Sequence, residues 1–442
     1  MATATPSLTG TGQRSPQRTL ARSALVTAVF IAPALVVRLG GLHPNPVVAL
    51  IVYGVAVVAA SFLLAWAAEA AQIDVSGGLA IAVLALIAVL PEYAVDLYYA
   101  YTAGHVPDYT QYAAANMTGS NRLLMGLGWP IVVFVGPLVA RKLTQRRPIV
   151  LSLDPSNRVE LGFLLIAGVA AFIIPAGGHI HILVGAALLG WFRFYLYKLT
   201  RGDVEEPDLI GTAAALGALP DRAGRATVII LFVVAAGVIL LCAQPFANSM
   251  IGAGTQLGID RFLLVQWLAP LASEAPEFII AIIFAARGKA TVAIATLICS
   301  KVNQWTLLMG SLPVAYMIGG GGPALPHGPA LELDARQIEE VLLTATQTLM
   351  GVALILGLRF NRAAAAALLG LFLVQFPLTS TTGRLILCGI YAAVAAVGFI
   401  INRRYLTATL AAPFTGHAKR HSGPSHPAET IAAGPDTDQP NS

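Results

Sequence analysis

Long apolar runs separated by short polar loops repeat along the whole chain and dominate its pattern. A membrane-spanning helix needs about 20 mostly apolar residues. The segments of this kind are Ser23–Leu39, Pro46–Ala71, Gly78–Tyr101, Tyr112–Ala140, Val159–Ala176, His179–Leu199, Thr227–Ala247, Arg261–Ala286, Thr291–Gly319, Glu339–Leu358, Ala363–Thr379 and Leu385–Ile401. The chain is 57% hydrophobic and 11% charged, whereas soluble proteins carry about 25% charged residues. The sequence therefore predicts an all-α polytopic membrane protein with about 12 spans.

Basic residues gather in every second loop except the short turn at Gln72–Ser76, which has none. They follow the even-numbered spans, in groups such as Arg141 with Lys142, Arg201 with Arg222, and Arg403 with Arg404. By the positive-inside rule, we expect a multi-pass protein of the cell membrane in which these loops and both termini are cytoplasmic. The net charge of +5 is explained by these loops, so we expect the lipid bilayer as a partner and no nucleic acid.

The same pattern divides the chain into segments. Two halves at 46–200 and 226–380 are joined by a cytoplasmic linker at 201–225. One further span precedes the halves at 23–41, and another follows them at 384–402. The polar ends, 1–22 and 406–442, have the composition of disordered segments.

Each half carries a proline next to a carboxylate inside membrane-grade apolar sequence. The first is Leu90-Pro91-Glu92 and the second is Glu274-Ala275-Pro276-Glu277. Each lies in a repeated hairpin, about 78–140 and about 261–319, whose second helix holds Gly119-Ser120-Asn121 or Cys299-Ser300-Lys301. The two copies run in opposite directions through the predicted topology. Such inverted repeats place a binding site near the bilayer centre, at the repeat interface.

The chemistry of these positions indicates a hard cation. Glu92 and Glu277 come about fourteen and sixteen residues into their spans, which puts both near mid-depth. Ionisable residues inside a membrane are functional by default, and each proline frees a backbone carbonyl. The neighbouring polar side chains are all oxygen ligands: Ser120, Asn121, Ser273, Ser300, Asn303 and Gln304. Such a set favours sodium, calcium or protons over zinc or copper, with Glu92 and Glu277 as the metal ligands.

Four further charged residues lie beside this set. Asp96 shares a helix face with Glu92, and Glu274 shares one with Glu277. Either acid joins the site, passes protons, or pairs with Arg122 or Lys301. The two bases in turn either neutralise a carboxylate or act as a fixed positive charge that replaces one bound cation.

These motifs resemble the alpha-repeats of the cation/calcium exchanger superfamily, most closely at Leu90-Pro91-Glu92, Gly119-Ser120-Asn121 and Ser273-Glu274-Ala275-Pro276-Glu277. The resemblance implies a ten-helix core of two inverted five-helix halves, here with one extra helix at each end. It implies Glu92 and Glu277 as central ligands. Ser120 or Asn121 in the first repeat, and Ser300 with Asn303 or Gln304 in the second, would complete the site.

The chain departs from the family pattern at two places. Ala88-Val89 stands where the family has hydroxyls, and Cys299-Ser300-Lys301 replaces the second Gly-Ser-Asn. Fewer ion positions and proton coupling are therefore expected. The register of the second helices stays open: aligning the serines pairs Leu124 with Gln304, whereas aligning the next glycines selects Asn121 and Asn303.

The resulting hypothesis is a secondary antiporter that exchanges calcium or sodium for protons or sodium by alternating access. It needs no cofactor beyond the transported ions. A degenerate homologue acting as an uncoupled channel or scaffold is the alternative. An intramembrane enzyme is the weakest reading, since the chain has no His-Glu-x-x-His motif. The residues do not rank the cations and do not specify an oligomeric state.

Overall fold

The protein is a bundle of helices in the computed structural model, which describes residues 16–71, 89–144, 150–201, 209, 211–322, 328–378 and 380–415. Before the linker the helices are α1 (Pro16–Leu39), α2 (Pro46–Ala71), α4 (Leu90–Ala103), α5 (Thr110–Leu123), α6 (Trp129–Thr144), α7 (Arg158–Ala170), α8 (Ile173–Gly177) and α9 (Ile182–Leu199). From residue 211 onward they are α10 (Gly211–Gly217), α11 (Asp221–Leu257), α12 (Arg261–Ser273), α13 (Ala275–Ala286), α14 (Ala290–Asn303), α15 (Met309–Ile318), α16 (Ala335–Ile355), α17 (Arg362–Val374), α18 (Thr381–Ile401) and α19 (Arg403–Ala411).

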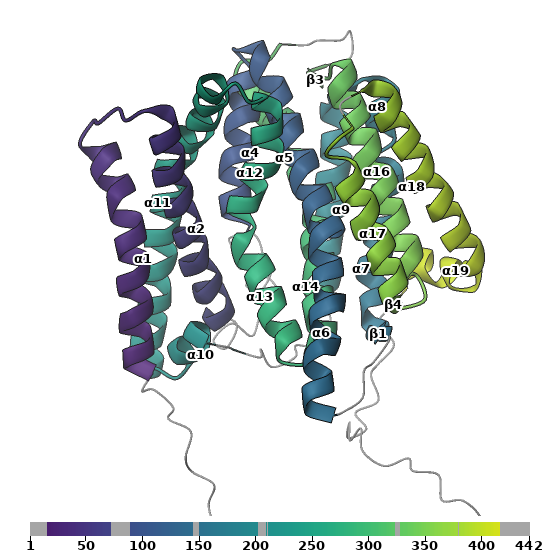
Figure 1. The fold of residues 1–442 in the computed structure, drawn as a ribbon, viewed down its shortest axis with the longest axis horizontal. Helices are drawn as coiled ribbons and strands as arrows, with labels where there is room; N and C mark the ends of the chain where they lie inside the picture. The colour runs from purple at the N-terminus through teal and green to yellow at the C-terminus, as the bar shows by residue number, and fades with distance from the viewer. Residues whose placement is uncertain are drawn as a thin grey trace, which may run out of the picture.

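The bundle has a central group of helices with a smaller group on either side (Figure 1). Helices α1, α2 and α11 pack together on one side, and α16 and α18 pack together on the other. Between them, α5 packs on α4 and α12, and α13 packs on α14 and α6. Two short antiparallel strand pairs cross between the halves. They are β1 (Val150–Ser152) with β4 (Arg359–Asn361), and β2 (His179–His181) with β3 (Ala330–Glu332).

The prediction of an all-α polytopic membrane protein is confirmed. Eight described helical segments are long and apolar enough to cross a membrane, two of them made of consecutive shorter helices at 155–177 and 290–318, and the bent pair α12–α13 makes a ninth. The count of twelve stays a prediction, because residues 78–88 of the third predicted span lie outside the described residues. Helix α17, which corresponds to the eleventh predicted span, has only 13 residues.

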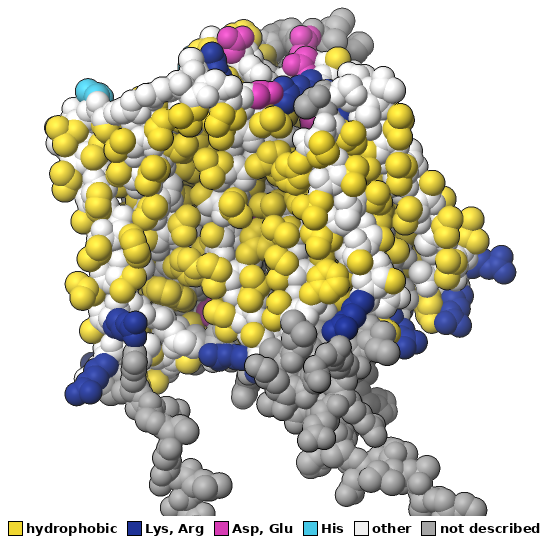
Figure 2. All heavy atoms as spheres, in the orientation of Figure 1, with side chains coloured by type: hydrophobic (Ala, Val, Ile, Leu, Met, Phe, Trp, Pro, Cys, Tyr) yellow, Lys and Arg dark blue, Asp and Glu magenta, His cyan; other side chains and the backbone are white. Residues whose placement is uncertain are grey.

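Apolar side chains cover the sides of the bundle, as a bilayer requires (Figure 2). Acidic side chains gather at one end, together with a few basic ones, and most of the visible basic side chains lie at the other end. We call these the acidic face, which carries the exposed residues Asp108, Asp260 and Glu332, and the basic face, which carries the exposed residues Arg201, Arg222, Arg287, Arg359 and Arg403.

Three predicted polar segments contain helix. Helix α1 already begins at Pro16, inside the segment 1–22 that was predicted to be disordered. Helix α19 continues to Ala411 within the predicted tail, while residues 416–442 lie outside the described part. The linker 201–225 holds α10 and the start of α11, because α10 packs against α1 and α2. Packing thus overrides the polar composition at these ends.

Several predicted spans have different bounds. Helix α11 runs through Pro245 for 37 residues and ends at Gly258, whose φ of +67° suits glycine. The predicted helical start at His179–His181 is strand β2, and α9 begins only at Ile182. Helix α16 begins at Ala335 because the side chain of Asp334 accepts a hydrogen bond from the Gln337 backbone N–H at 2.8 Å.

The internal duplication is visible in the helices themselves. A five-residue π-helical segment follows α5 at Leu124–Gly128, and another follows α14 at Gln304–Leu308. Each begins four residues after a serine, Ser120 or Ser300. The structure therefore favours the register that aligns these serines. A π-helical turn shifts the backbone hydrogen bonds and is frequent at functional sites.

Candidate cation-binding site

Two helices that start inside the bundle carry the repeated acidic motifs. Pro91 and Glu92 lie in the first turn of α4, and Pro276 and Glu277 lie in the first turn of α13. Helix α13 is bent by 54° from α12 at Glu274. Proline fits the first turn because its missing N–H would have no partner there. The free N–H groups and the dipole of a helix start favour negative charge, which suits both carboxylates.

Gln304 connects the carboxylates of the two repeats. Its Nε2 donates to Glu274 Oε1 at 2.6 Å and to Glu92 Oε1 at 3.3 Å. All three side chains are buried, with 2% to 6% exposure. The carboxylates of Glu92 and Glu274 also lie next to each other. The centre of the site therefore combines α4 of the first repeat with the α12–α13 bend and the second π-helical segment.

The other predicted ligands surround this centre in different ways. Ser120 lies beside Glu92, and Ser300 lies beside the half-buried Glu277, which is within electrostatic reach of Glu92. The Ser273 hydroxyl donates to Ala269 O of its own helix at 3.1 Å. The structure thus brings Glu92, Glu277 and Gln304 together with two serines.

The two predicted asparagines lie at the margin of this cluster. Asn121 donates to Met117 O at 3.1 Å, and its Oδ1 is buried without a hydrogen bond among the described residues. Asn303 is half-buried and accepts a bond from the Tyr93 hydroxyl on its backbone carbonyl at 3.4 Å. Of the two, Asn121 offers the buried free oxygen.

Glu274 occupies a more central place than the sequence suggested. Sequence reasoning treated it as an accessory to Glu277, since only Glu277 occupies the repeated Pro-Glu position. The bend between α12 and α13 turns Glu274 toward Glu92 and Gln304. The spacing of three residues between two intramembrane acids was the available signal.

Lys301 adds a positive charge to the site. Its Nζ donates to the backbone carbonyl of Asn121 at 2.5 Å and lies 5.9 Å from the ring centre of Trp305. The side chain is fully buried and interacts electrostatically with Glu274 and Glu92. Lys301 thereby offsets part of the negative charge that the glutamates place there.

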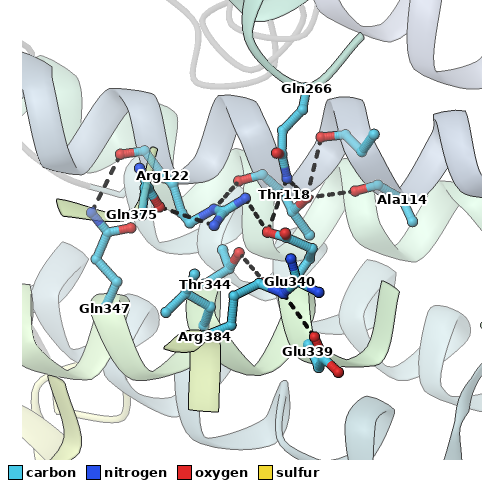
Figure 3. A network of polar contacts seen from close by, with 12 residues as sticks. Ala114, Thr118, Arg122, Gln266, Glu339, Glu340, Thr344, Gln347, Gln375 and Arg384 are labelled. Atoms are coloured by element: carbon cyan, nitrogen blue, oxygen red, sulfur yellow. Dashed lines mark hydrogen bonds and ion pairs between the residues drawn. The ribbon is translucent and has the colours of Figure 1, made fainter. Parts of the chain in front are cut away.

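Arg122 forms an ion pair with Glu340 on α16 (Figure 3). It also donates to Gln375 Oε1 at 3.0 Å and lies 5.0 Å from the ring centre of Trp267. Gln266 donates to the same Glu340 carboxylate at 3.0 Å. This pairing answers the alternative left open by the sequence, in which Arg122 pairs with Asp96 or Glu274.

Sequence reasoning missed Glu340 because its span lies in the second half but outside the repeated hairpin at about 261–319, where the candidate ligands were sought. The signal was two successive acids, Glu339 and Glu340, at the start of a predicted span. Glu339 pairs with Arg384 of α18 at 2.7 Å (Figure 3). Both acids therefore belong to a buried network that ties α16 to its neighbours.

A family comparison identifies the protein class. The model of the family described as "Sodium/calcium exchanger protein" matches residues 45–201 and 227–378. The chain belongs to the sodium/calcium exchanger family. Members of this family are membrane cation exchangers and not enzymes. The prediction of the cation/calcium exchanger superfamily is thereby confirmed.

Solved structures of exchangers share this fold. The H⁺/Ca²⁺ exchanger CAX is 37% identical, with a TM-score of 0.83 over 90% of this chain and 98% of that chain. The native YfkE structure is 16% identical, with a TM-score of 0.57 over 84% and 99%. A structure of the sodium-calcium exchanger NCX_Mj is 14% identical, with a TM-score of 0.51 over 76% and 99%. A comparison with curated proteins found no match.

Proposed function

We propose that this exchanger is a Ca²⁺/H⁺ antiporter whose central ligands are Glu92, Glu274 and Glu277. The adjacent carboxylates of Glu92 and Glu274 carry this proposal. Two buried negative charges in contact repel each other strongly unless a cation or a proton lies between them. Either a divalent cation or protons can neutralise these two charges. Exchange requires two ions that compete for the same carboxylates in this way.

The remaining ligands favour protons over sodium as the counter-ion. A sodium site of the family type uses several neutral oxygens, whereas the Ser273 hydroxyl is bonded to its own helix and Ala88-Val89 offers no hydroxyl. The 37% identity with an H⁺/Ca²⁺ exchanger supports the same choice.

Alternating access follows from the cost of an empty site. Ionised carboxylates without a cation are costly in a low-dielectric interior, so the transition between inward-open and outward-open forms favours the calcium-loaded or protonated site. Obligatory exchange results, because neither ion leaves without its replacement. The Ser120, Asn121, Ser300 and Asn303 oxygens would complete the coordination of the calcium ion in the loaded form.

The organisation of the protein in a cell membrane belongs to the same proposal. The halves 46–200 and 226–380 form the exchanging unit, and the spans at 23–41 and 384–402 flank it. The concentration of arginines on the basic face supports a cytoplasmic position for that face and for both termini.

Ion flux in proteoliposomes tests this function. An outward-directed proton gradient should drive ⁴⁵Ca²⁺ uptake into the liposomes. Ca²⁺ uptake should in turn release protons from the lumen into the external medium. If Ca²⁺ uptake depended on a sodium gradient instead, sodium and not the proton would be the counter-ion. Calcium flux without any counter-flux would make the protein an uncoupled channel. Glu332→Gln, on the exposed acidic face, serves as a matched control that keeps full exchange.

A further inference from the structure

A second polar pair lies one helical turn from the central carboxylates, toward the acidic face. Asp96 follows Glu92 by four residues on α4, and Asn116 precedes Ser120 by four residues on α5. The two helices pack against each other and run in opposite directions. Four residues correspond to about 6 Å along a helix, so both side chains are displaced by the same amount in the same direction.

These two side chains are buried without partners. Asp96 and Asn116 are both 0% exposed. They lie within interaction distance of each other, but Oδ1 and Oδ2 of Asp96, and Oδ1 and Nδ2 of Asn116, make no hydrogen bond of good geometry within the described part of the chain. Buried polar atoms in native proteins are almost always satisfied. A carboxylate and an amide with so much unused hydrogen-bonding capacity therefore indicate an occupant that supplies the missing partners.

Neither nearby base neutralises Asp96. Arg122 is held by Glu340 and Gln375, and Lys301 interacts with Glu274 and Glu92. The charged neighbour of Asp96 is Glu92, which is also negative. The pair thus offers two carboxylate oxygens and one amide oxygen, the ligand chemistry that Ca²⁺ and other hard cations prefer.

The pair lies between the central site and the acidic face. Tyr112, one turn beyond Asn116, packs against Tyr99 with tilted rings whose centres are 5.8 Å apart. The Tyr99 hydroxyl donates to Ala247 O at 3.1 Å and ties this layer to α11. On its other side, Tyr112 lines an open depression of about 640 Å³ with Gln111 and Phe262. A cation that enters from this depression would meet Asp96 before Glu92.

We propose that Asp96 and Asn116 form an outer cation-binding position, which receives Ca²⁺ from the acidic face and passes it to Glu92. The identity of the cation rests on the function proposed above, whereas the position rests on the unpartnered side chains. The ion keeps part of its water shell there, because the two residues supply only three oxygens. Displacement of the tyrosine layer opens the route to the depression.

The test is the Michaelis constant for ⁴⁵Ca²⁺, measured with the full chain in membrane vesicles of both orientations. Asp96→Asn should raise KM about tenfold for Ca²⁺ offered at the acidic face, the change that about 1.4 kcal/mol of binding free energy produces. KM at the basic face should not change. Asp108→Asn removes an exposed charge from the same face and should leave both constants unaltered.

A variant with increased affinity for Ca²⁺ provides a second test, because misfolding would not increase the affinity. Asn116→Asp adds a carboxylate beside Asp96 and should lower KM at the acidic face. Unchanged constants in both variants would mean that water alone fills the position, and would overturn the proposal. Loss of flux from both faces in Asp96→Asn would assign Asp96 to the central site instead. Normal exchange in Glu277→Gln would refute the proposed central site without bearing on Asp96.

Discussion

Arg122 on α5 and Glu340 on α16 form an ion pair whose side chains are only 1% and 5% exposed. The neighbouring residue, Asn121, accepts the Lys301 hydrogen bond on its backbone carbonyl. Adjacent residues of α5 therefore have different partners: Asn121 contacts the candidate site, and Arg122 contacts the supporting helices. Arg122 is accordingly a positioning residue, and it does not stand in for a transported cation.

Breaking this ion pair should destabilise the exchanger. Arg122→Met leaves the Glu340 carboxylate buried without its counter-charge, and Glu340→Gln does the same to Arg122. Loss of one partner from a buried pair costs about 3–5 kcal/mol. Thermal unfolding of the purified protein should show a clear decrease in Tm for each single variant. The double variant Arg122→Met with Glu340→Met should recover much of the loss, because no charge is left unpaired.

An exposed ion pair supplies the control for that measurement. Arg336 and Asp260 lie 2.8 Å apart with side chains 32% and 42% exposed. Exposed pairs contribute about 0–1 kcal/mol, so Arg336→Gln should hardly change Tm. An equal loss of stability in Arg336→Gln and Arg122→Met would show that burial of the Arg122 pair has no special role.

Neutralising a central glutamate should abolish exchange without preventing membrane insertion. Glu277→Gln and Glu274→Gln keep the shape of the side chain and remove the negative charge that binds Ca²⁺. Neither variant should transport ⁴⁵Ca²⁺ above the level of empty liposomes. Size-exclusion chromatography should show the same folded particle as the wild type. Exchange at the normal rate by Glu274→Gln would remove that residue from the ligand set and leave Glu92 and Glu277.

The sequence could predict the membrane fold and the repeats because both depend on local pattern. Apolar length identifies spans, and duplication identifies the acidic motifs at Glu92 and Glu277 in each half. Gln304 was among the predicted ligands because it lies on the second helix of the second repeat, whereas its bond to Glu92 comes from the structure. These inferences needed no knowledge of how the helices pack.

Packing decided what the sequence could not. Arg122 is 218 positions from Glu340, and many carboxylates were available to it from the sequence alone. The 54° bend at Glu274 brings this residue close to Glu92. The periodicity of apolar residues along the helices does not predict that angle. Likewise, α1 begins at Pro16 and α19 extends to Ala411, although the composition of both ends is polar.

Removing the charge of Lys301 should strengthen Ca²⁺ binding. The ammonium lies within electrostatic reach of Glu274 and Glu92 and repels a cation at the same place. In Lys301→Met, KM for Ca²⁺ should fall about tenfold, equivalent to roughly 1.4 kcal/mol. Wild type and variants are compared at one neutral pH, so that competition from protons is the same in each measurement. Lys301→Arg keeps the charge and serves as the control, and a higher KM in Lys301→Met would show that the lysine organises the site instead.

The closest helix crossing of the two repeats gives a prediction about stability. A Cβ at position 119 on α5 would lie 1.7 Å from the backbone carbonyl oxygen of Gln266 on α12. A backbone atom cannot move aside as a flexible side chain does, so Gly119→Ala must push the helices apart at a cost of about 3 kcal/mol or more. Gly237→Ala on α11 is the matched control, because no atom lies within 4 Å of its Cβ. Tm should decrease for Gly119→Ala and stay constant or rise for Gly237→Ala. Equal values would show that α5 and α12 tolerate a wider crossing.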